Sequence, residues 1–167
     1  EAPLCEFARA FFAKAPRNLL EERGPDQLAA MTLGAEALVE LLGERAVFLT
    51  PHRDQLPESL PRHVLWQEYV PLRALLPKTS VLIHHGGIGT TAEALHAGTP
   101  QLVLPLAHDQ FDNGARVETL GVGRSLPASR LDTKRLLRCL GRLLDDEGLR
   151  ARCRAVAGHF PGDPGMD

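Results

Sequence analysis

Residues with the chemistry to bind a phosphorylated sugar are concentrated between Ser80 and Gln110. An imidazole at His85 is followed by glycine at positions 86, 87 and 89, and then by the hydroxyl group of Thr90. Glycine lets the backbone turn sharply and approach a ligand closely. A helix that begins at such a loop has unpaired N–H groups and a positive dipole end, and both favour phosphate. This pattern predicts a site for a diphosphate.

Side chains further along the same segment suit the hydroxyl groups of sugars. Glu93 lies four residues after Gly89, so its carboxylate is about one helical turn, ~5–6 Å, beyond the glycines and well placed for a ribose. Asp109 and Gln110 offer acceptors and donors for a further sugar. A ligand with a nucleotide at one end and a sugar at the other is the simplest match to this set.

A strand–loop–helix–strand unit must position these residues. The continuously apolar run at 81–83 is typical of a strand buried on both faces, and 101–106 reads as a second such strand. Between them we expect a helix that begins near Ile88 or Gly89 and is ended by Gly98, with Pro100 beyond. In open α/β sheets ligands bind at the carboxyl ends of the strands, where this unit has its polar residues.

The same glycines also satisfy a second motif, the dinucleotide fingerprint G-x-G-x-x-A, from Gly87 to Ala92. Asp109 follows roughly 20 residues later, as that fingerprint requires. Against it, about eighty residues precede the strand, and two histidines replace the usual neutral lead-in. An NAD(P)-dependent oxidoreductase domain, a non-catalytic nucleotide-binding module and a purely structural domain stay open as alternatives. A Walker loop is excluded, because no Gly-Lys-Ser/Thr follows the glycines.

Residues 85–94 carry a familiar pattern together with Gly98-Thr99-Pro100, Pro105, Asp109-Gln110 and Asn113. They resemble the donor-binding signature of GT-B fold glycosyltransferases, above all the UDP-glycosyltransferase family with its bacterial natural-product, sterol and rhamnosyl-type members. The resemblance extends over 46–123. It implies the carboxyl-terminal half of a GT-B protein.

The resemblance also implies which residues contact the donor. They lie on successive loops and at one helix start, and they are Val70, His85, Gly87, Gly89, Thr90, Glu93, Asp109 and Gln110. In this family the histidine and the helix N-terminus hold the diphosphate, the glutamate holds the ribose, and the Asp-Gln pair holds the sugar. The base lies on the loop that corresponds to 69–72, where we expect mostly backbone contacts.

By the same resemblance, the whole enzyme would be an inverting transferase that moves a hexosyl group from a UDP- or TDP-sugar to an acceptor hydroxyl. The nucleotide sugar is a substrate, and neither a cofactor nor a metal is expected. The catalytic base of the family belongs to an amino-terminal acceptor-binding domain. No catalytic residue is therefore expected in this chain, which would need that domain as its partner.

Length and composition fit one α/β domain. At 167 residues the chain is long enough for one core and too short for two Rossmann-like domains. We expect a Rossmann-like parallel sheet with helices on both faces over 1–160, and a disordered tail at 161–167. The net charge of −2 gives no electrostatic footprint for nucleic acid. No apolar run approaches the roughly 18 residues that a stable membrane insertion needs, and three cysteines without motif spacing suggest the cytoplasm.

Apolar periodicity predicts the remaining elements. Helices are expected at 4–14, 27–42, 71–76, 111–120, 131–144 and 148–157, and strands at 46–50, 63–70 and 122–126. Because no strand is found before 46, the domain is expected to lack its first strand. Asp112 and Asn113 are expected to cap the helix after Gln110, and His84 to be a buried, hydrogen-bonded residue.

Overall fold

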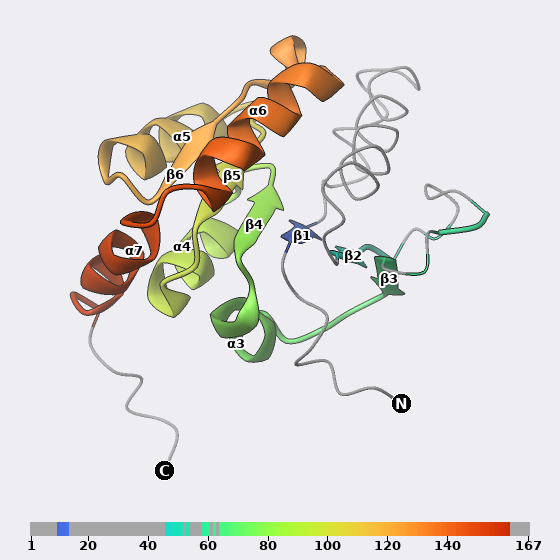
Figure 1. Ribbon diagram of the computed structural model, residues 1–167, viewed down its shortest axis with the longest axis horizontal. Coiled ribbons are helices and arrows are strands. Elements are labelled where there is room, and N and C mark those ends of the chain that lie inside the picture. The colour runs from blue at the N-terminus through green and yellow to red at the C-terminus, as the bar shows by residue number, and fades with distance from the viewer. Residues whose placement is uncertain are drawn as a thin grey trace.

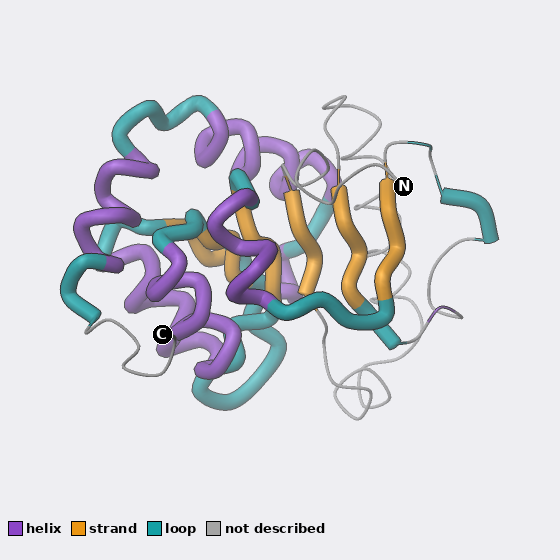
Figure 2. The backbone as a smooth tube through the Cα atoms, turned by 90° about the horizontal axis from the view of Figure 1, so that it is seen from below, coloured by secondary structure: helices purple, strands orange, loops and turns teal. Residues whose placement is uncertain are grey.

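The computed structural model describes residues 10–13, 46–51, 53, 58–60, 62 and 64–160. The strands of this part of the chain form one six-stranded sheet (Figure 1). In chain order they are β1 (Ala10–Ala13), β2 (Ala46–Leu49), β3 (Val64–Gln67), β4 (Val81–His84), β5 (Gln101–Val103) and β6 (Gly123–Ser125). They run side by side in Figure 2, where strands are orange.

The strand order is β3-β2-β1-β4-β5-β6, and each neighbouring pair is parallel. This is the order of a doubly wound Rossmann sheet, whose winding direction reverses between β1 and β4. Ligands of such sheets bind in the crevice outside the carboxyl ends of the strands at this reversal. The structure therefore confirms the predicted α/β class, and the predicted strand–loop–helix–strand unit begins with one of the two strands at the reversal.

Helices follow most of the strands. They are α3 (Leu72–Leu75) with the short 3-10 helix η3 (Leu76–Lys78), α4 (Ile88–Ala97), α5 (Gln110–Thr119), the 3-10 turn η4 (Ala128–Arg130), α6 (Thr133–Leu144) and α7 (Leu149–Ala157). Gly98 ends α4 in the left-handed conformation, with φ of +65°, as the sequence predicts. The helices predicted at 71–76, 111–120, 131–144 and 148–157 are also confirmed, apart from small differences at their ends.

Helices cover both faces of the sheet around β4. Successive side chains of a strand point to opposite faces, so neighbouring residues of β4 pack in different clusters. Val81 and Ile83 belong to a core cluster that includes Leu136 and Leu140 of α6. Leu82, between them, packs instead in a cluster with Ala94 of α4 and with the α3 region. These two clusters confirm the predicted burial of this strand on both faces.

The helix expected at 4–14 is wrong over Ala10–Ala13. This segment is a strand that pairs with β2 on one side and β4 on the other, so a strand does precede Ala46 and lies in the middle of the sheet. Apolar spacing cannot separate a buried helix segment from a buried strand in so short a run. The two neighbours in the sheet decide the outcome. The helix expected at 27–42 and the tail expected at 161–167 lie outside the described residues.

None of the helices in the described ranges is both long enough and apolar enough to cross a lipid bilayer. Cys139 of α6 and Cys153 of α7 are free thiols. Burial raises the pKa of the Cys153 thiol to about 11, so this cysteine is a packed, protonated residue.

Candidate functional site

The first turn of α4 is an exposed, glycine-lined helix start at the carboxyl end of β4. Gly87 is its N-cap, with an extended backbone, and no side chain caps the helix. Ile88 is 64% exposed, and a Cβ atom on Gly89 would have no atom within 4 Å. The first-turn N–H groups are thus without a capping side chain, and together with the helix dipole they favour an anion.

The imidazole ring of His85 lies against this helix start. A Cβ atom on Gly87 would be 2.7 Å from Nε2 of His85, so only glycine lets the ring approach the N-cap this closely. The ring is half-buried. An imidazole ring carries a hydrogen-bond donor on at least one of its two nitrogens.

Gly86 sets the path of the loop between β4 and α4. Its φ is +92°, a conformation that L side chains rarely adopt, and a Cβ atom there would be 2.6 Å from Cγ1 of Val103 and 3.1 Å from the carbonyl oxygen of Gln110. Both polar groups of its backbone are bonded to buried side chains. The N–H donates to Nδ1 of His84 at 3.2 Å, and the carbonyl accepts from Nδ2 of Asn113 at 2.9 Å.

His84 is a neutral residue that accepts a hydrogen bond from this loop. Because its Nδ1 accepts from Gly86, its proton is on Nε2, which lies 2.9 Å from Oε1 of Gln101. Burial lowers the pKa of His84 to about 4 and outweighs the hydrogen bond to Gln101, which raises it. The expectation of a buried, hydrogen-bonded histidine is confirmed.

Across the described residues, no group of three or more His, Cys, Asp and Glu side chains is arranged to hold a metal ion.

Glu93 lies at the surface, one turn beyond the glycines. Its side chain is 35% exposed, and its Oε2 is 3.4 Å from Nε of Arg73 on α3. An ion pair this exposed contributes at most about 1 kcal/mol, so ligand hydroxyl groups can compete with it.

Val70 lies in the loop between β3 and α3, and its side chain points into the core. The Val70 side chain is buried in a cluster with Leu75, Leu76 and Leu82. Tyr69, beside it, is 76% exposed. Any contact of Val70 with a ligand must therefore use its backbone.

Asp109 and Gln110 have different environments. Asp109 is exposed, and its Oδ2 accepts a hydrogen bond from Nδ2 of Asn113 at 3.0 Å. Gln110 is buried, and its Oε1 accepts from the N–H groups of Leu106 and Ala107 at 2.8 and 3.1 Å. The side-chain carbonyl of Gln110 thus supports the turn after β5. The side-chain amide nitrogen is the group through which Gln110 would contact a sugar.

Asn113 is the residue whose role the sequence reasoning missed. The prediction that Asp112 and Asn113 cap α5 is wrong: the N-cap is Asp109, and no side chain caps the helix. Asp112 pairs with Arg116 at 2.7 Å. Asn113 is only 6% exposed and reaches across to Gly86. Its position four residues after Asp109, on the same helical face, was the available signal.

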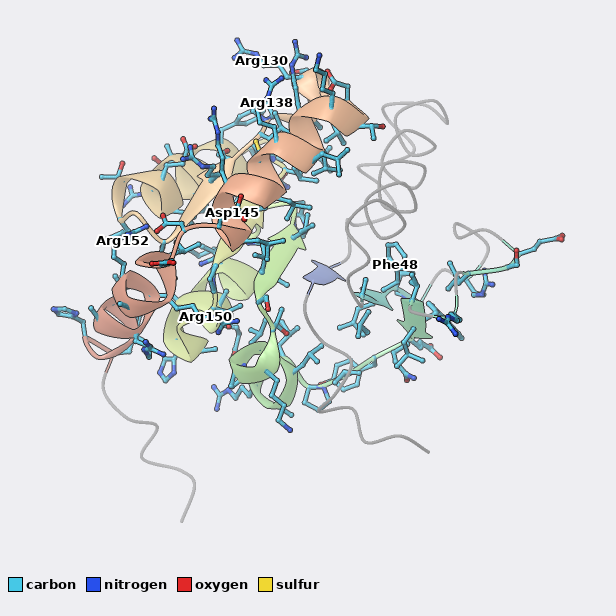
Figure 3. The ribbon with its side chains drawn as sticks, in the orientation of Figure 1. Phe48, Arg130, Arg138, Asp145, Arg150 and Arg152 are labelled. Atoms are coloured by element: carbon cyan, nitrogen blue, oxygen red, sulfur yellow. The ribbon has the colours of Figure 1, made fainter. Side chains whose placement is uncertain are left out.

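The arginines of α7 stabilise the domain away from this edge. Arg150 donates to the carbonyl oxygen of Thr79 at 3.1 Å, and Arg152 donates to that of Gly121 at 2.8 Å and pairs with Asp146. Figure 3 labels these two arginines. The predicted donor residues instead follow the carboxyl ends of β3, β4 and β5. Asn113 joins the loops after β4 and β5, and the Arg73–Glu93 pair joins α3 to α4.

Comparisons with known proteins agree with this geometry. The family model described as "Erythromycin biosynthesis protein CIII-like, C-terminal domain" matches residues 32–165. The chain is 34% identical over 132 residues to the aklavinone 7-beta-L-rhodosaminyltransferase of Streptomyces galilaeus, which covers 79% of this chain and 28% of that protein. It is 32% identical over 129 residues to the 10-deoxymethynolide desosaminyltransferase of Streptomyces venezuelae, with 77% and 30% covered.

Solved structures give the same result. A spinosyn rhamnosyltransferase complexed with thymidine diphosphate matches with a TM-score of 0.77 and 32% identity, over 90% of this chain and 41% of that one. The chain thus spans well under half the length of the proteins it matches, and the predicted GT-B resemblance is confirmed. The chain belongs to the family of erythromycin biosynthesis protein CIII-like C-terminal domains, the Rossmann-like carboxyl-terminal part of GT-B glycosyltransferases.

Proposed function

We propose that this domain binds the nucleotide-sugar donor of a glycosyltransferase, with the donor diphosphate at the first turn of α4. The observation that carries the proposal is the uncapped, glycine-lined helix start beside His85, at the winding reversal of the sheet. Glycosyltransferases among the relatives support the reaction class. The similar structure that contains thymidine diphosphate supports a TDP- or UDP-sugar as the donor.

In this proposal each part of the donor has its own contacts. The N–H groups of Gly89 and Thr90, the Thr90 hydroxyl and His85 hold the diphosphate. Glu93 accepts hydrogen bonds from the ribose hydroxyls, and the backbone near Val70 borders the base. The carboxylate of Asp109 and the amide nitrogen of Gln110 hold the sugar.

The reaction proposed for the whole enzyme is transfer of a hexosyl group to an acceptor hydroxyl with inversion. Positive charge develops on the sugar as its bond to the diphosphate breaks, and negative charge develops on the leaving diphosphate. Fixed donors aimed at developing charge stabilise a transition state more than they stabilise the substrate. The helix start and His85 would supply that stabilisation here.

Residues 1–160 would form one nucleotide-sugar-binding domain, located in the cytoplasm as the free thiols of Cys139 and Cys153 suggest. An amino-terminal acceptor-binding domain would supply the acceptor site and the catalytic base. The domain alone would then bind donor without transferring the sugar.

Replacement of His85 by alanine tests the assignment. We expect thymidine diphosphate to bind about tenfold more weakly, the effect of losing one hydrogen bond to a charged group. The thermal unfolding midpoint should stay within about 2 °C, because the half-buried ring contributes little to the core. Calorimetric titration and a thermal melt measure the two quantities.

His96→Ala is the matched control, since His96 is exposed in the last turn of the same helix. This variant should keep the affinity of the unmodified chain. If His85→Ala lost its fold together with its affinity, His85 would be a structural residue, and the proposed diphosphate contact would lose its support.

A further inference from the structure

One side-chain amide connects the two loops that the proposed function uses. Nδ2 of Asn113 lies 2.9 Å from the carbonyl oxygen of Gly86 and 3.0 Å from Oδ2 of Asp109. An amide nitrogen carries two hydrogens, so both are donated, one to each loop. Gly86 precedes the N-cap of α4, whereas Asp109 is the N-cap of α5.

The Gly86 end of this connection is fixed on both sides. Its N–H donates to His84, which Gln101 holds in turn, and its carbonyl accepts from Asn113. The peptide groups on either side of Gly86 are therefore oriented by buried side chains. The backbone that leads into the first turn of α4 takes its direction from this arrangement.

The Asp109 end is different, because this carboxylate is exposed. Without Asn113 it would rotate freely in solvent, which costs side-chain entropy when a ligand is bound. The hydrogen bond from Nδ2 selects one orientation before the ligand arrives. Asn113 itself is buried, so its own position is set by the surrounding core.

The residue type fits this double role closely. An ionised aspartate has no donor, a serine hydroxyl has a single hydrogen, and a glutamine would place its amide one methylene further out. Helix capping does not explain Asn113, because it lies inside α5 and bonds across to a residue 27 positions away.

We infer that Asn113 is a positioning residue that couples the diphosphate-binding loop after β4 to the carboxylate of Asp109 after β5. This inference rests on the proposed donor binding. It means that the diphosphate contact and the sugar contact are set by one side chain. A change at Asn113 disturbs both, whereas a change at Asp109 leaves the Gly86 loop in place.

The test measures thymidine diphosphate affinity by calorimetry for Asn113→Ala and Thr99→Val. Thr99 is the matched control. It is buried, and its hydroxyl donates to the carbonyl oxygen of Leu76 at 2.7 Å. It precedes β5, at the amino ends of the strands and so away from the proposed site. Asn113→Ala should weaken binding about tenfold, because the Gly86 carbonyl loses the donor that orients the backbone leading into α4. Thr99→Val should stay within about twofold of the unmodified chain.

Backbone amide NMR spectra recorded without ligand provide the second readout. In Asn113→Ala the resonances of Gly87 and Gly89 should shift together with that of Asp109. In Asp109→Ala those of Gly87 and Gly89 should stay in place. If Asn113→Ala fails to fold, Asn113→Ser, which keeps one donor, is measured in its place and should show a smaller change of the same kind.

Two results would overturn the inference. One is wild-type affinity in the Asn113 variant with spectral changes confined to α5. The other is an equal loss of affinity in Thr99→Val, which would assign the effect to general destabilisation. Failure of the unmodified chain to bind thymidine diphosphate would instead reject the proposed function, while the ligand-free spectra would still decide the coupling.

Discussion

Glutamate in place of Gly89 should weaken thymidine diphosphate binding by at least about a hundredfold, without loss of stability. Gly89 is the second residue of α4, and a Cβ atom there meets open space, so the new side chain fits. A carboxylate in the first turn of a helix is favourable by about 0.3–1 kcal/mol, and glutamate also exceeds glycine in helix propensity. The same carboxylate takes the place of the diphosphate and repels it. The affinity measured by titration calorimetry should therefore fall, while the free energy of unfolding measured in urea should stay the same or rise.

Gly141→Glu is the control for this substitution. Gly141 lies inside α6, a Cβ atom there also meets open space, and the change in charge is the same. This variant should keep the affinity of the unmodified chain. Retained affinity in Gly89→Glu would mean that the diphosphate does not bind at the start of α4.

Alanine in place of Gly86 should have the largest effect on the fold itself. The added Cβ atom would lie 2.6 Å from Val103 at a φ of +92°, so it combines a steric clash with backbone strain. Together these cost roughly 2–5 kcal/mol of the free energy of unfolding. Because this loop leads into α4, the protein that remains folded should also bind thymidine diphosphate poorly.

Urea unfolding of Gly86→Ala beside Gly141→Ala measures this cost. The second variant removes a glycine from a helix interior with open space around it, and should gain about 0.5–1 kcal/mol. Unchanged stability in Gly86→Ala would show that the loop has an alternative path that accepts a side chain. The description of Gly86 as the residue that sets this loop would then be wrong.

The β4–α4–β5 unit could be predicted because its signals are local. A continuous apolar run marks a strand buried on both faces, and Gly98 marks the end of the helix through its own left-handed backbone. Such features depend on residues close in the sequence. The candidate residues His85, Gly89 and Glu93 were predictable together with the unit because they lie within it.

The strand β1 could not be predicted for the opposite reason. The sequence at Ala10–Ala13 is two alanines around two phenylalanines, which suits a helix as well as a strand. Its conformation is decided by pairing with β2 and β4, whose residues follow tens of positions later. Contacts at that separation are not encoded in local spacing.

The roles of Asn113 and Gln110 were hidden in a similar way. Both stand in a segment rich in polar residues, where a cap or a ligand contact is the ordinary expectation. In the fold, the side-chain carbonyl of Gln110 accepts from the turn after β5, and the side-chain amide of Asn113 donates to Gly86. Sequence spacing indicates that Asn113 shares a face with Asp109, but only the packing of α5 against the glycine loop reveals the second partner.

The proposed donor contacts all depend on the start of α4 being a site for the diphosphate of a nucleotide sugar. Titration calorimetry of the unmodified chain, with thymidine diphosphate and NADH as competing ligands, examines this dependence in one experiment. We expect saturable binding of thymidine diphosphate and much weaker binding of NADH. Preferential binding of NADH would contradict the nucleotide-sugar assignment and indicate a dinucleotide site, and binding of neither ligand would leave the glycine loop as a purely structural turn.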